Sequence, residues 1–268
     1  MEKSNIHEKI KLLTGSGMWH TQEVEDLPSV HLSDGPHGLR KQEEKERQNN
    51  VSLVSTCYPT ASALACSWDV TAAERLGRAV AKEAWNADVA VLLGPGINMK
   101  RSPLCGRNFE YFSEDPFLAG RLGAAYVSAA QGEDVAVSLK HFAANNQETN
   151  RQTSNSQIDE RALREIYLSA FEYVVKTARP ATIMASYNRL NGYYACENRH
   201  LLTEILREEW GFDGVVISDW GACADLAKAV KAGMDLEMPD SHGIHARKLK
   251  AALKAGEISE GDIAKAAG

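Results

Sequence analysis

Residues 214–221, Gly-Val-Val-Ile-Ser-Asp-Trp-Gly, decide the fold prediction for this chain. Three β-branched residues between Gly214 and a Ser-Asp pair are typical of a short strand that is buried on both faces. A charged residue directly after such a strand lies at its C-terminal edge, where α/β folds place their active sites. Asp219 is therefore a candidate for chemistry. The same residue also suits a second role, the N-cap of a helix that begins near Ala222.

Strand and helix patterns alternate on both sides of this stretch. Strands are predicted at 29–34, 60–67, 89–93, 135–142, 181–186, 214–218 and 234–238. Helices are predicted at 5–13, 71–86, 117–131, 201–210, 222–231 and 245–255, and another, capped by Asp159, carries an apolar stripe from Leu163 to Val175. Alternation of this kind predicts a parallel sheet with crossover helices.

The predicted fold is α/β, a (β/α)8-type barrel resembling triosephosphate isomerase barrels, with one strand irregular or missing. An eighth strand is expected in 104–113. The 268 residues suit one such barrel, which needs about 250 residues, although two small domains are the alternative. An open, doubly wound sheet is disfavoured because Gly94-Pro95-Gly96 lacks the spacing of a dinucleotide-binding turn. Since no linker or low-complexity tract divides the chain, residues 1–268 are predicted to form a single domain, with a solvated loop at 41–50.

Composition excludes several classes of partner. A net charge of −6 gives no reason to expect nucleic acid or an anionic membrane as a partner. The N-terminal sequence has no signal-peptide pattern, and no apolar run approaches membrane-spanning length. The five scattered cysteines show no CxxC spacing, so we expect reduced thiols, a cytoplasmic location, and neither a metal nor a cofactor.

The predicted strand ends supply a set of polar and aromatic side chains that a barrel would gather on one rim. Charged groups of both signs can form paired hydrogen bonds with vicinal hydroxyls, and an indole packs against the C–H face of a sugar ring. The set therefore suits a small, neutral, hydroxyl-rich ligand. Its members are Asp34 with Arg40 beyond it, Lys140, His141, Tyr187, Asp219 and Trp220, together with the loop residues Arg107 and Arg151.

Longer motifs resemble the barrel domain of family 3 glycoside hydrolases, and the β-glucosidase branch of that family most of all. The resemblance covers nearly the whole chain in the expected order. It is carried by SDGPHGLRKQ (33–42), GPGINMKRSPLCGRNFEYFSEDP (94–116), SLKHFAANNQETNR (138–151), MASYNRLNG (184–192), GFDGVVISDWGA (211–222) and AGMDLEMP (232–239).

The resemblance implies retaining hydrolysis of terminal β-D-glucosides through a covalent glycosyl-enzyme, with glucose or a β-glucoside as the bound small molecule. It makes Asp219 the nucleophile and places Tyr187 near it. It implies that the sugar hydroxyls are bound by Asp34, Arg107, Lys140, His141 and Arg151. In the same comparison Trp220 shapes the floor of the subsite, and Arg40 and Met184 support it.

The general acid/base is where the sequence departs from the family. In the β-glucosidase branch this glutamate comes from a second, α/β sandwich domain, which we expect to be absent from this chain and supplied by a complementing domain or a second chain. The single-domain branch uses a histidine in a KHFPGHG-type loop, and the corresponding stretch here is KHFAANNQ (140–147). Glu110, Glu114 and Glu148 lie on the right loops but inherit no such role. The barrel is then a fragment, part of a split or permuted enzyme, or a domain used alone.

Two other functions remain open from the sequence. One is a Schiff-base lyase in which Lys140 at a strand end forms the imine. The other is a non-catalytic sugar-binding barrel, because contacts to glucose do not require an acid/base.

Overall fold

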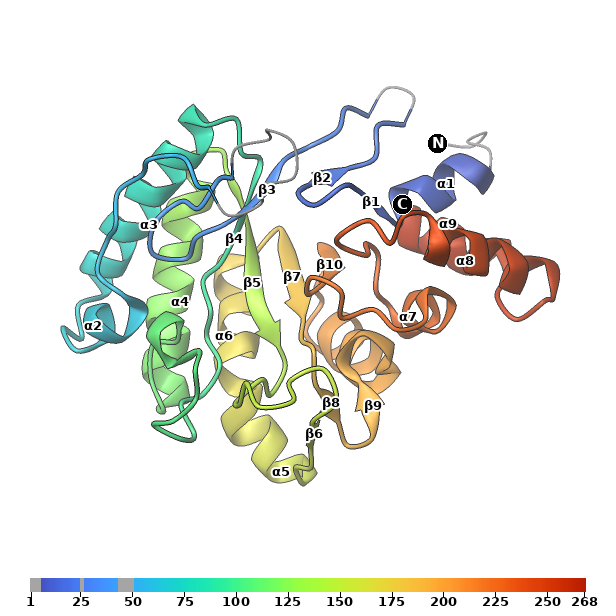
Figure 1. Ribbon diagram of the computed structural model, residues 1–268. Coiled ribbons are helices and arrows are strands. Elements are labelled where there is room, and N and C mark those ends of the chain that lie inside the picture. Colours follow the sequence, from blue (N-terminus) through green and yellow to red (C-terminus); the bar gives the residue numbers. More distant parts are fainter. Residues whose placement is uncertain (1–5, 25–26, 43–50) are drawn as a thin grey trace.

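Five parallel strands form the centre of the computed structural model, which describes residues 6–24, 27–42 and 51–268 (Figure 1). Their spatial order is β10–β7–β5–β4–β3, and each neighbouring pair is parallel. Each of the five lies within a strand predicted from the sequence. They are β3 (Leu32–Asp34), β4 (Val91–Leu93), β5 (Ala136–Phe142), β7 (Thr182–Ala185) and β10 (Val215–Ser218).

Short pairings close this sheet into a ring. Ile217 of β10 bridges Leu236 in parallel, and the next residue, Glu237, bridges Thr14. Strand β1 (Gly15–Ser16) then pairs antiparallel with β2 (His20–Thr21), and His20 bridges His31 just before β3. The (β/α)8-type barrel is thus confirmed. Its irregular part is the N-terminal hairpin, where one ring member runs antiparallel to the rest.

Two of the predicted strands are wrong. Residues 60–67 contain the helix α2 (Ala61–Ala65), which Thr60 caps by accepting a hydrogen bond from the backbone N–H of Ala63. Alanine and leucine favour a helix once such a cap is present. The stretch 104–113 contains no strand and instead forms a turn of 3₁₀ helix, η1 (Asn108–Glu110), which Asn108 stabilises by donating to the carbonyl of Ser102.

The helices α3 (Val70–Asn86), α4 (Pro116–Gln131) and α6 (Ser169–Ala178) pack side by side against the sheet (Figure 1). Asp69 and Asp115 cap the first two. Gly77 allows α3 and α4 to approach closely, since a Cβ atom there would lie 2.4 Å from the carbonyl oxygen of Tyr126. The α3–α4 contact therefore depends on a residue without a side chain.

The remaining elements flank these layers. The predicted helix after Asp159 is divided into α5 (Glu160–Ala162), the π-helical η2 (Leu163–Tyr167) and α6. The others are α1 (Ile6–Leu12), the strands β6 (Asn155–Ser156), β8 (Arg189–Leu190) and β9 (Tyr193–Tyr194), the 3₁₀ turn η3 (Ala195–Glu197), the π-helical η4 (His200–Glu209), and the helices α7 (Leu226–Ala232), α8 (Ile244–Lys254) and α9 (Glu260–Ala267).

The core has two parts, as the parallel strands require. A large cluster lies between the strands and the helices, and a smaller one fills the barrel interior. The buried members of the interior cluster are Leu32, Val91, Leu93, Met184, Ile217, Leu236 and Met238. Both faces of each strand are thereby covered, which is why these strands read as continuous apolar runs.

The structure also bears on the expectations for the cysteines, for membrane-spanning segments and for the loop at 41–50. All five cysteines are free thiols, but only Cys196 and Cys223 are buried. Across the part of the chain that the structure describes, no helix is long and apolar enough to cross a membrane. Most of the predicted loop at 41–50 lies outside the described residues.

Candidate active site

One cavity at the carboxyl ends of the barrel strands gathers every residue singled out as a site candidate. Its volume is about 270 Å³, slightly below the ~300–1,000 Å³ typical of drug-sized ligands, so it suits a single sugar ring. The structure adds Trp19 and Leu93 to the predicted set. The lining residues are Trp19, Asp34, Arg40, Leu93, Arg107, Lys140, His141, Arg151, Met184, Tyr187, Asp219 and Trp220.

Asp219 follows β10 directly and holds one carboxylate oxygen free. Its Oδ1 accepts a hydrogen bond of 2.8 Å from the backbone N–H of Trp220. Its Oδ2 is buried with no hydrogen-bond partner among the described residues, 3.6 Å from His141 Nε2 and 3.9 Å from Arg107 Nη1. The helix-capping role is wrong for Asp219, because Asp225 caps α7. A carboxylate with one tethered and one unpartnered oxygen is placed to attack a bound electrophile.

A chain of alternating charges runs along one side of the cavity. Lys140 Nζ lies 3.0 Å from Asp34 Oδ1 and 3.4 Å from Glu110 Oε2. The other oxygen of Glu110 accepts a hydrogen bond from Arg107 Nε. Burial acts to raise the pKa of Asp34, but Lys140 outweighs it and holds that pKa below its usual value. Burial likewise acts to lower the pKa of Lys140, which Asp34 and Glu110 keep above its usual value. Asp34 is thus an anion and Lys140 a cation.

His141 is neutral, and its tautomer follows from its neighbours. Burial, then Arg107, Lys140 and Arg151, hold its pKa well below the usual value. Arg107 Nη2 lies 2.6 Å from His141 Nε2 and can only donate, so this nitrogen accepts. The ring proton is then on Nδ1, which faces the hydroxyl of Tyr111 at 3.1 Å. His141 therefore has no proton directed toward the Asp219 carboxylate.

Lys140 and His141 are neighbours in sequence, yet both line the cavity. Successive side chains of a regular strand point to opposite faces. The register of β5 against β7 shifts between Lys140 and Phe142, which breaks this alternation. The side chain of Asn98 holds the backbone of His141 in this position. It donates to the carbonyl of His141 at 2.8 Å and accepts from its N–H at 2.7 Å.

Aromatic rings also line the cavity. Trp220 lies 5.3 Å from Trp19, measured between ring centroids, and donates its indole N–H to the carbonyl of Met18. The guanidinium of Arg151 sits 4.3 Å above the ring of Tyr187. Trp19 was missed because its N-terminal hairpin carries no strand pattern, and the only signal was a tryptophan among small and polar residues.

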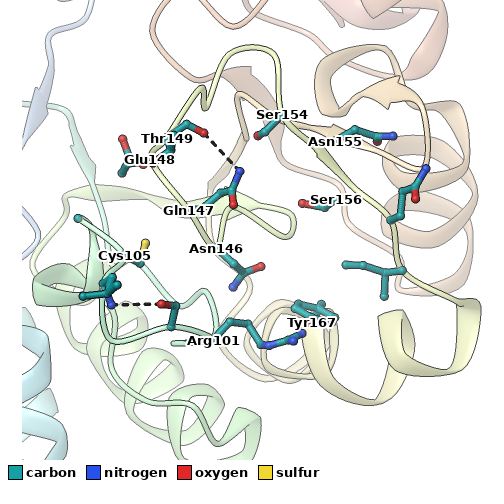
Figure 2. A pocket seen from close by; sticks show the side chains of 15 residues that line it. Arg101, Cys105, Asn146, Gln147, Glu148, Thr149, Ser154, Asn155, Ser156 and Tyr167 are labelled. Atoms are coloured by element: carbon teal, nitrogen blue, oxygen red, sulfur yellow. Dashed lines mark hydrogen bonds between the residues drawn. The ribbon is translucent and has the colours of Figure 1, made fainter.

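The three glutamates considered as acids do not line this cavity. Both oxygens of Glu110 face cations, and its side chain is only 4% exposed. Glu114 is exposed to solvent. Glu148 lines a second cavity of about 440 Å³ between loop 101–106 and loop 146–158 (Figure 2). Its Oε2 accepts from Arg151 at 2.9 Å. Among the described lining residues the carboxylates are therefore Asp34 and Asp219.

The ionised Asp219 is predicted to lower the stability of the fold at neutral pH. Burial raises the pKa of its carboxyl, although Arg107, Lys140, the Trp220 N–H and Arg151 oppose the shift. A raised folded-state pKa contributes stability that is complete below the unfolded pKa and is lost as pH rises through the folded one. We expect Asp219→Asn to raise the thermal unfolding midpoint at neutral pH by about 2–4 °C, the shift that corresponds to ~1 kcal/mol in a domain of this size.

Calorimetric scans across the acid range test this expectation. The gain should shrink as pH falls and the wild-type carboxyl becomes protonated. Asp213→Asn, which changes an exposed aspartate that pairs with Arg179 at 2.8 Å, is the matched control. A lower midpoint for Asp219→Asn at neutral pH would show that the carboxylate stabilises the fold instead.

Comparisons with known proteins show what the chain is similar to. Thermostable beta-glucosidase B of Acetivibrio thermocellus is 52% identical over 264 residues, which cover 97% of this chain and 35% of that protein. Exo-alpha-(1->6)-L-arabinopyranosidase of Bifidobacterium longum is 50% identical over 242 residues, 88% of this chain and 32% of that protein. The solved structure of beta-glucosidase 3B from Thermotoga neapolitana in complex with glucose matches with a TM-score of 0.94 at 39% identity, covering 99% of this chain and 40% of that one.

The chain therefore spans between 32% and 40% of the length of these three relatives. Residues 36–268 match the family described as Glycosyl hydrolase family 3 N terminal domain. Together with identities of about one half over most of the chain, this match shows that the chain belongs to glycosyl hydrolase family 3.

Proposed function

We propose that this protein hydrolyses terminal, non-reducing β-D-glucosides with retention of configuration, and that Asp219 is the nucleophile. The observation that carries the proposal is the unpartnered, buried Oδ2 of Asp219 in a cavity the size of one sugar ring. Two of the relatives above are named beta-glucosidases, and one of their structures holds glucose.

The proposed reaction has two displacements. In the first, Oδ2 of Asp219 bonds to the anomeric carbon as the glycosidic bond breaks, and an acid protonates the departing oxygen. In the second, the same group takes a proton from water, whose oxygen bonds to the anomeric carbon and releases Asp219. Arg107, 3.9 Å from Oδ2, stabilises the carboxylate as it departs.

In this proposal the charged side chains of the cavity bind the sugar hydroxyls. Asp34 accepts from sugar hydroxyls, while Lys140, Arg107 and Arg151 donate to them, and His141 belongs to the same hydroxyl-binding set with its Nε2 facing Arg107. Trp220 packs against the sugar face, Tyr187 lies near the nucleophile, and Arg40 and Met184 complete the wall. Arg40 is held near Asp34, with 3.7 Å between Nη1 and Oδ2.

The proton donor is proposed to come from outside the barrel, from a complementing α/β sandwich domain or a second chain. This is supported by the engagement of Glu110 with two cations and by the greater length of the relatives. We further propose that residues 1–268 form a single domain. The five free thiols favour a reducing compartment, the cytoplasm, which cell fractionation would test.

The alternative functions have less support from the geometry. An imine-forming lysine is activated by a lowered pKa, whereas Asp34 and Glu110 raise the pKa of Lys140 despite its burial. A non-catalytic sugar-binding barrel would not need the free Oδ2 of Asp219. Failure to turn over any activated glycoside would favour that function.

Product analysis tests the proposed reaction directly. Nitrophenyl β-D-glucoside should release the β anomer of glucose first, as read by proton NMR before mutarotation. Because one relative is named an arabinopyranosidase, nitrophenyl α-L-arabinopyranoside should be assayed in parallel. Faster turnover of the arabinoside would show that the preferred substrate is an arabinopyranoside and not a glucoside, and it would leave the proposed retaining mechanism unchanged. Initial release of the α anomer of glucose would exclude retention of configuration.

Asp34 is predicted to act in binding and not in bond cleavage. Loss of a charged acceptor from a buried hydroxyl costs about 1.5–3 kcal/mol, so Asp34→Ala should weaken glucose binding by roughly one to two orders of magnitude. Isothermal calorimetry with glucose gives the measurement. Lys140 keeps Glu110 as a second partner at 3.4 Å, so the variant retains a counter-ion. Glu114→Ala is the control, and unchanged affinity in Asp34→Ala would exclude the role.

A further inference from the structure

A second group of potential ligands lies outside the Asp219 cavity. Cys223 follows β10 in the loop that leads to α7, Glu237 belongs to the segment that bridges Thr14, and His245 lies in the first turn of α8. One ligand atom from each lies within 4.8 Å of the other two. None of the three lines the Asp219 cavity. The spacing along the sequence, 14 and 8 residues, matches no metal motif, so the cluster is visible only in the fold.

The group is buried and incompletely paired. Glu237 is 3% exposed and Cys223 is 5% exposed. Oε1 of Glu237 is hydrogen-bonded to Nδ1 of His245, but Oε2 is buried with no hydrogen-bond partner among the described residues. An unpaired buried carboxylate oxygen is costly unless a cation or a donor reaches it. The cluster thus has unused capacity for a ligand.

The surroundings of the cluster favour a cation. Burial, followed by Cys196, Glu237, Glu197 and Asp225, raises the pKa of the Cys223 thiol. Burial, followed by Asp240, also raises the pKa of Glu237, and interactions with His245 and Ser241 oppose this shift. Acidic groups therefore converge on this point from several elements, since Glu237, Glu197 and Asp225 all act on the Cys223 thiol.

We propose that Cys223, Glu237 and His245 bind a zinc-like divalent ion through the thiolate sulfur, a carboxylate oxygen and an imidazole nitrogen. These three ligand types are the ones that Zn²⁺ takes in proteins, and three of them leave a fourth position for water. Mg²⁺ and Ca²⁺ prefer oxygen ligands and would bind poorly. Binding would release the thiol proton and any proton held between His245 and Glu237.

A bound ion would connect the segment that follows the nucleophile to its neighbour in the barrel. Cys223 lies four residues after Asp219. Gly221 already donates to the carbonyl of Met238 at 2.9 Å, next to Glu237. A metal at the cluster adds a cross-link between the same two segments and one to α8, which packs against α7 (Figure 1). The ion is therefore structural, and its binding does not depend on the proposed glycosidase activity.

Titration of the purified protein with Co²⁺ tests the site, because a cobalt–thiolate bond absorbs in the near ultraviolet. The parent protein carries Cys57→Ser and Cys66→Ser, which removes the two exposed thiols. A saturable thiolate band with one-to-one stoichiometry is expected, and added Zn²⁺ should abolish it. Zn²⁺ should also raise the thermal unfolding midpoint of the parent.

Variants assign the ligands. Cys223→Ser should remove the band, and His245→Gln should weaken binding by at least the ~10–100-fold that loss of an outer-shell partner costs. Cys196→Ser, at the neighbouring buried thiol, is the matched control and should retain the band. No saturable band in the parent, or a band that survives Cys223→Ser, would overturn the site. Loss of the band in Cys196→Ser with retention in Cys223→Ser would do the same.

Discussion

Asp219→Asn is expected to lower kcat on nitrophenyl β-D-glucoside by about 10⁴-fold or more, as loss of a catalytic nucleophile does in other enzymes. The amide cannot form the glycosyl ester through Oδ2. The change is otherwise small, because the remaining oxygen still accepts from the Trp220 N–H at the position where Oδ1 accepts at 2.8 Å. The new amide nitrogen would face His141 Nε2, which lies 3.6 Å from Oδ2.

Steady-state kinetics should show this loss in kcat with glucose affinity retained. Asp213→Asn, which changes an exposed aspartate just before β10, should keep wild-type kinetics. Residual activity of more than about one hundredth would point to another nucleophile, since a residue that acts through positioning or a single hydrogen bond accounts for ~10²–10³-fold.

The second large effect concerns the proton donor. A positioned acid contributes about 10²–10⁴-fold, but an aryl leaving group such as nitrophenolate barely needs the proton. Residues 1–268 expressed alone should therefore hydrolyse nitrophenyl β-D-glucoside slowly and leave cellobiose almost untouched. The glycosyl-enzyme should accumulate, because no base activates water for the second step. Azide, which needs no base, should speed turnover and yield a glycosyl azide.

Progress curves with both substrates, with and without azide, give the measurement. Glu148→Gln serves as a check for an acid within the barrel, because Oε1 of Glu148 accepts no hydrogen bond among the described residues, although Arg107 Nε lies 3.8 Å from it. Brisk hydrolysis of cellobiose by residues 1–268 would show that the barrel holds its own acid. Loss of that activity in Glu148→Gln would then identify it.

The fold was predictable where single segments carry strong patterns. The apolar runs at β4, β5 and β10 read correctly because strands covered on both faces need apolar residues throughout. The patterns failed where pairing is set by distant partners. The bridges from Thr14 to Glu237 and from His20 to His31 close the ring through residues 14–21, which have no strand pattern of their own. The helix α9 was missed although Ser259 and Asp262 form a capping box.

The site residues were predictable because charged and aromatic side chains follow apolar strands. Asp34 ends β3, Lys140 lies in the C-terminal half of β5, and Asp219 directly follows β10, and a barrel brings such strand ends together. The sequence could not predict the contacts between these side chains. Glu110 joins Arg107 and Lys140 from a loop that was expected to hold a strand. Trp19 enters through a hairpin that local patterns do not reveal.

Covalent labelling tests the central claim most directly. A deoxyfluoro glucoside with a good leaving group should inactivate the protein and leave one glucosyl adduct, and peptide mapping by mass spectrometry locates it. The adduct is predicted on the peptide that contains Asp219, and Asp219→Asn should take up no label. An adduct on Asp34, or on any glutamate, would contradict the account.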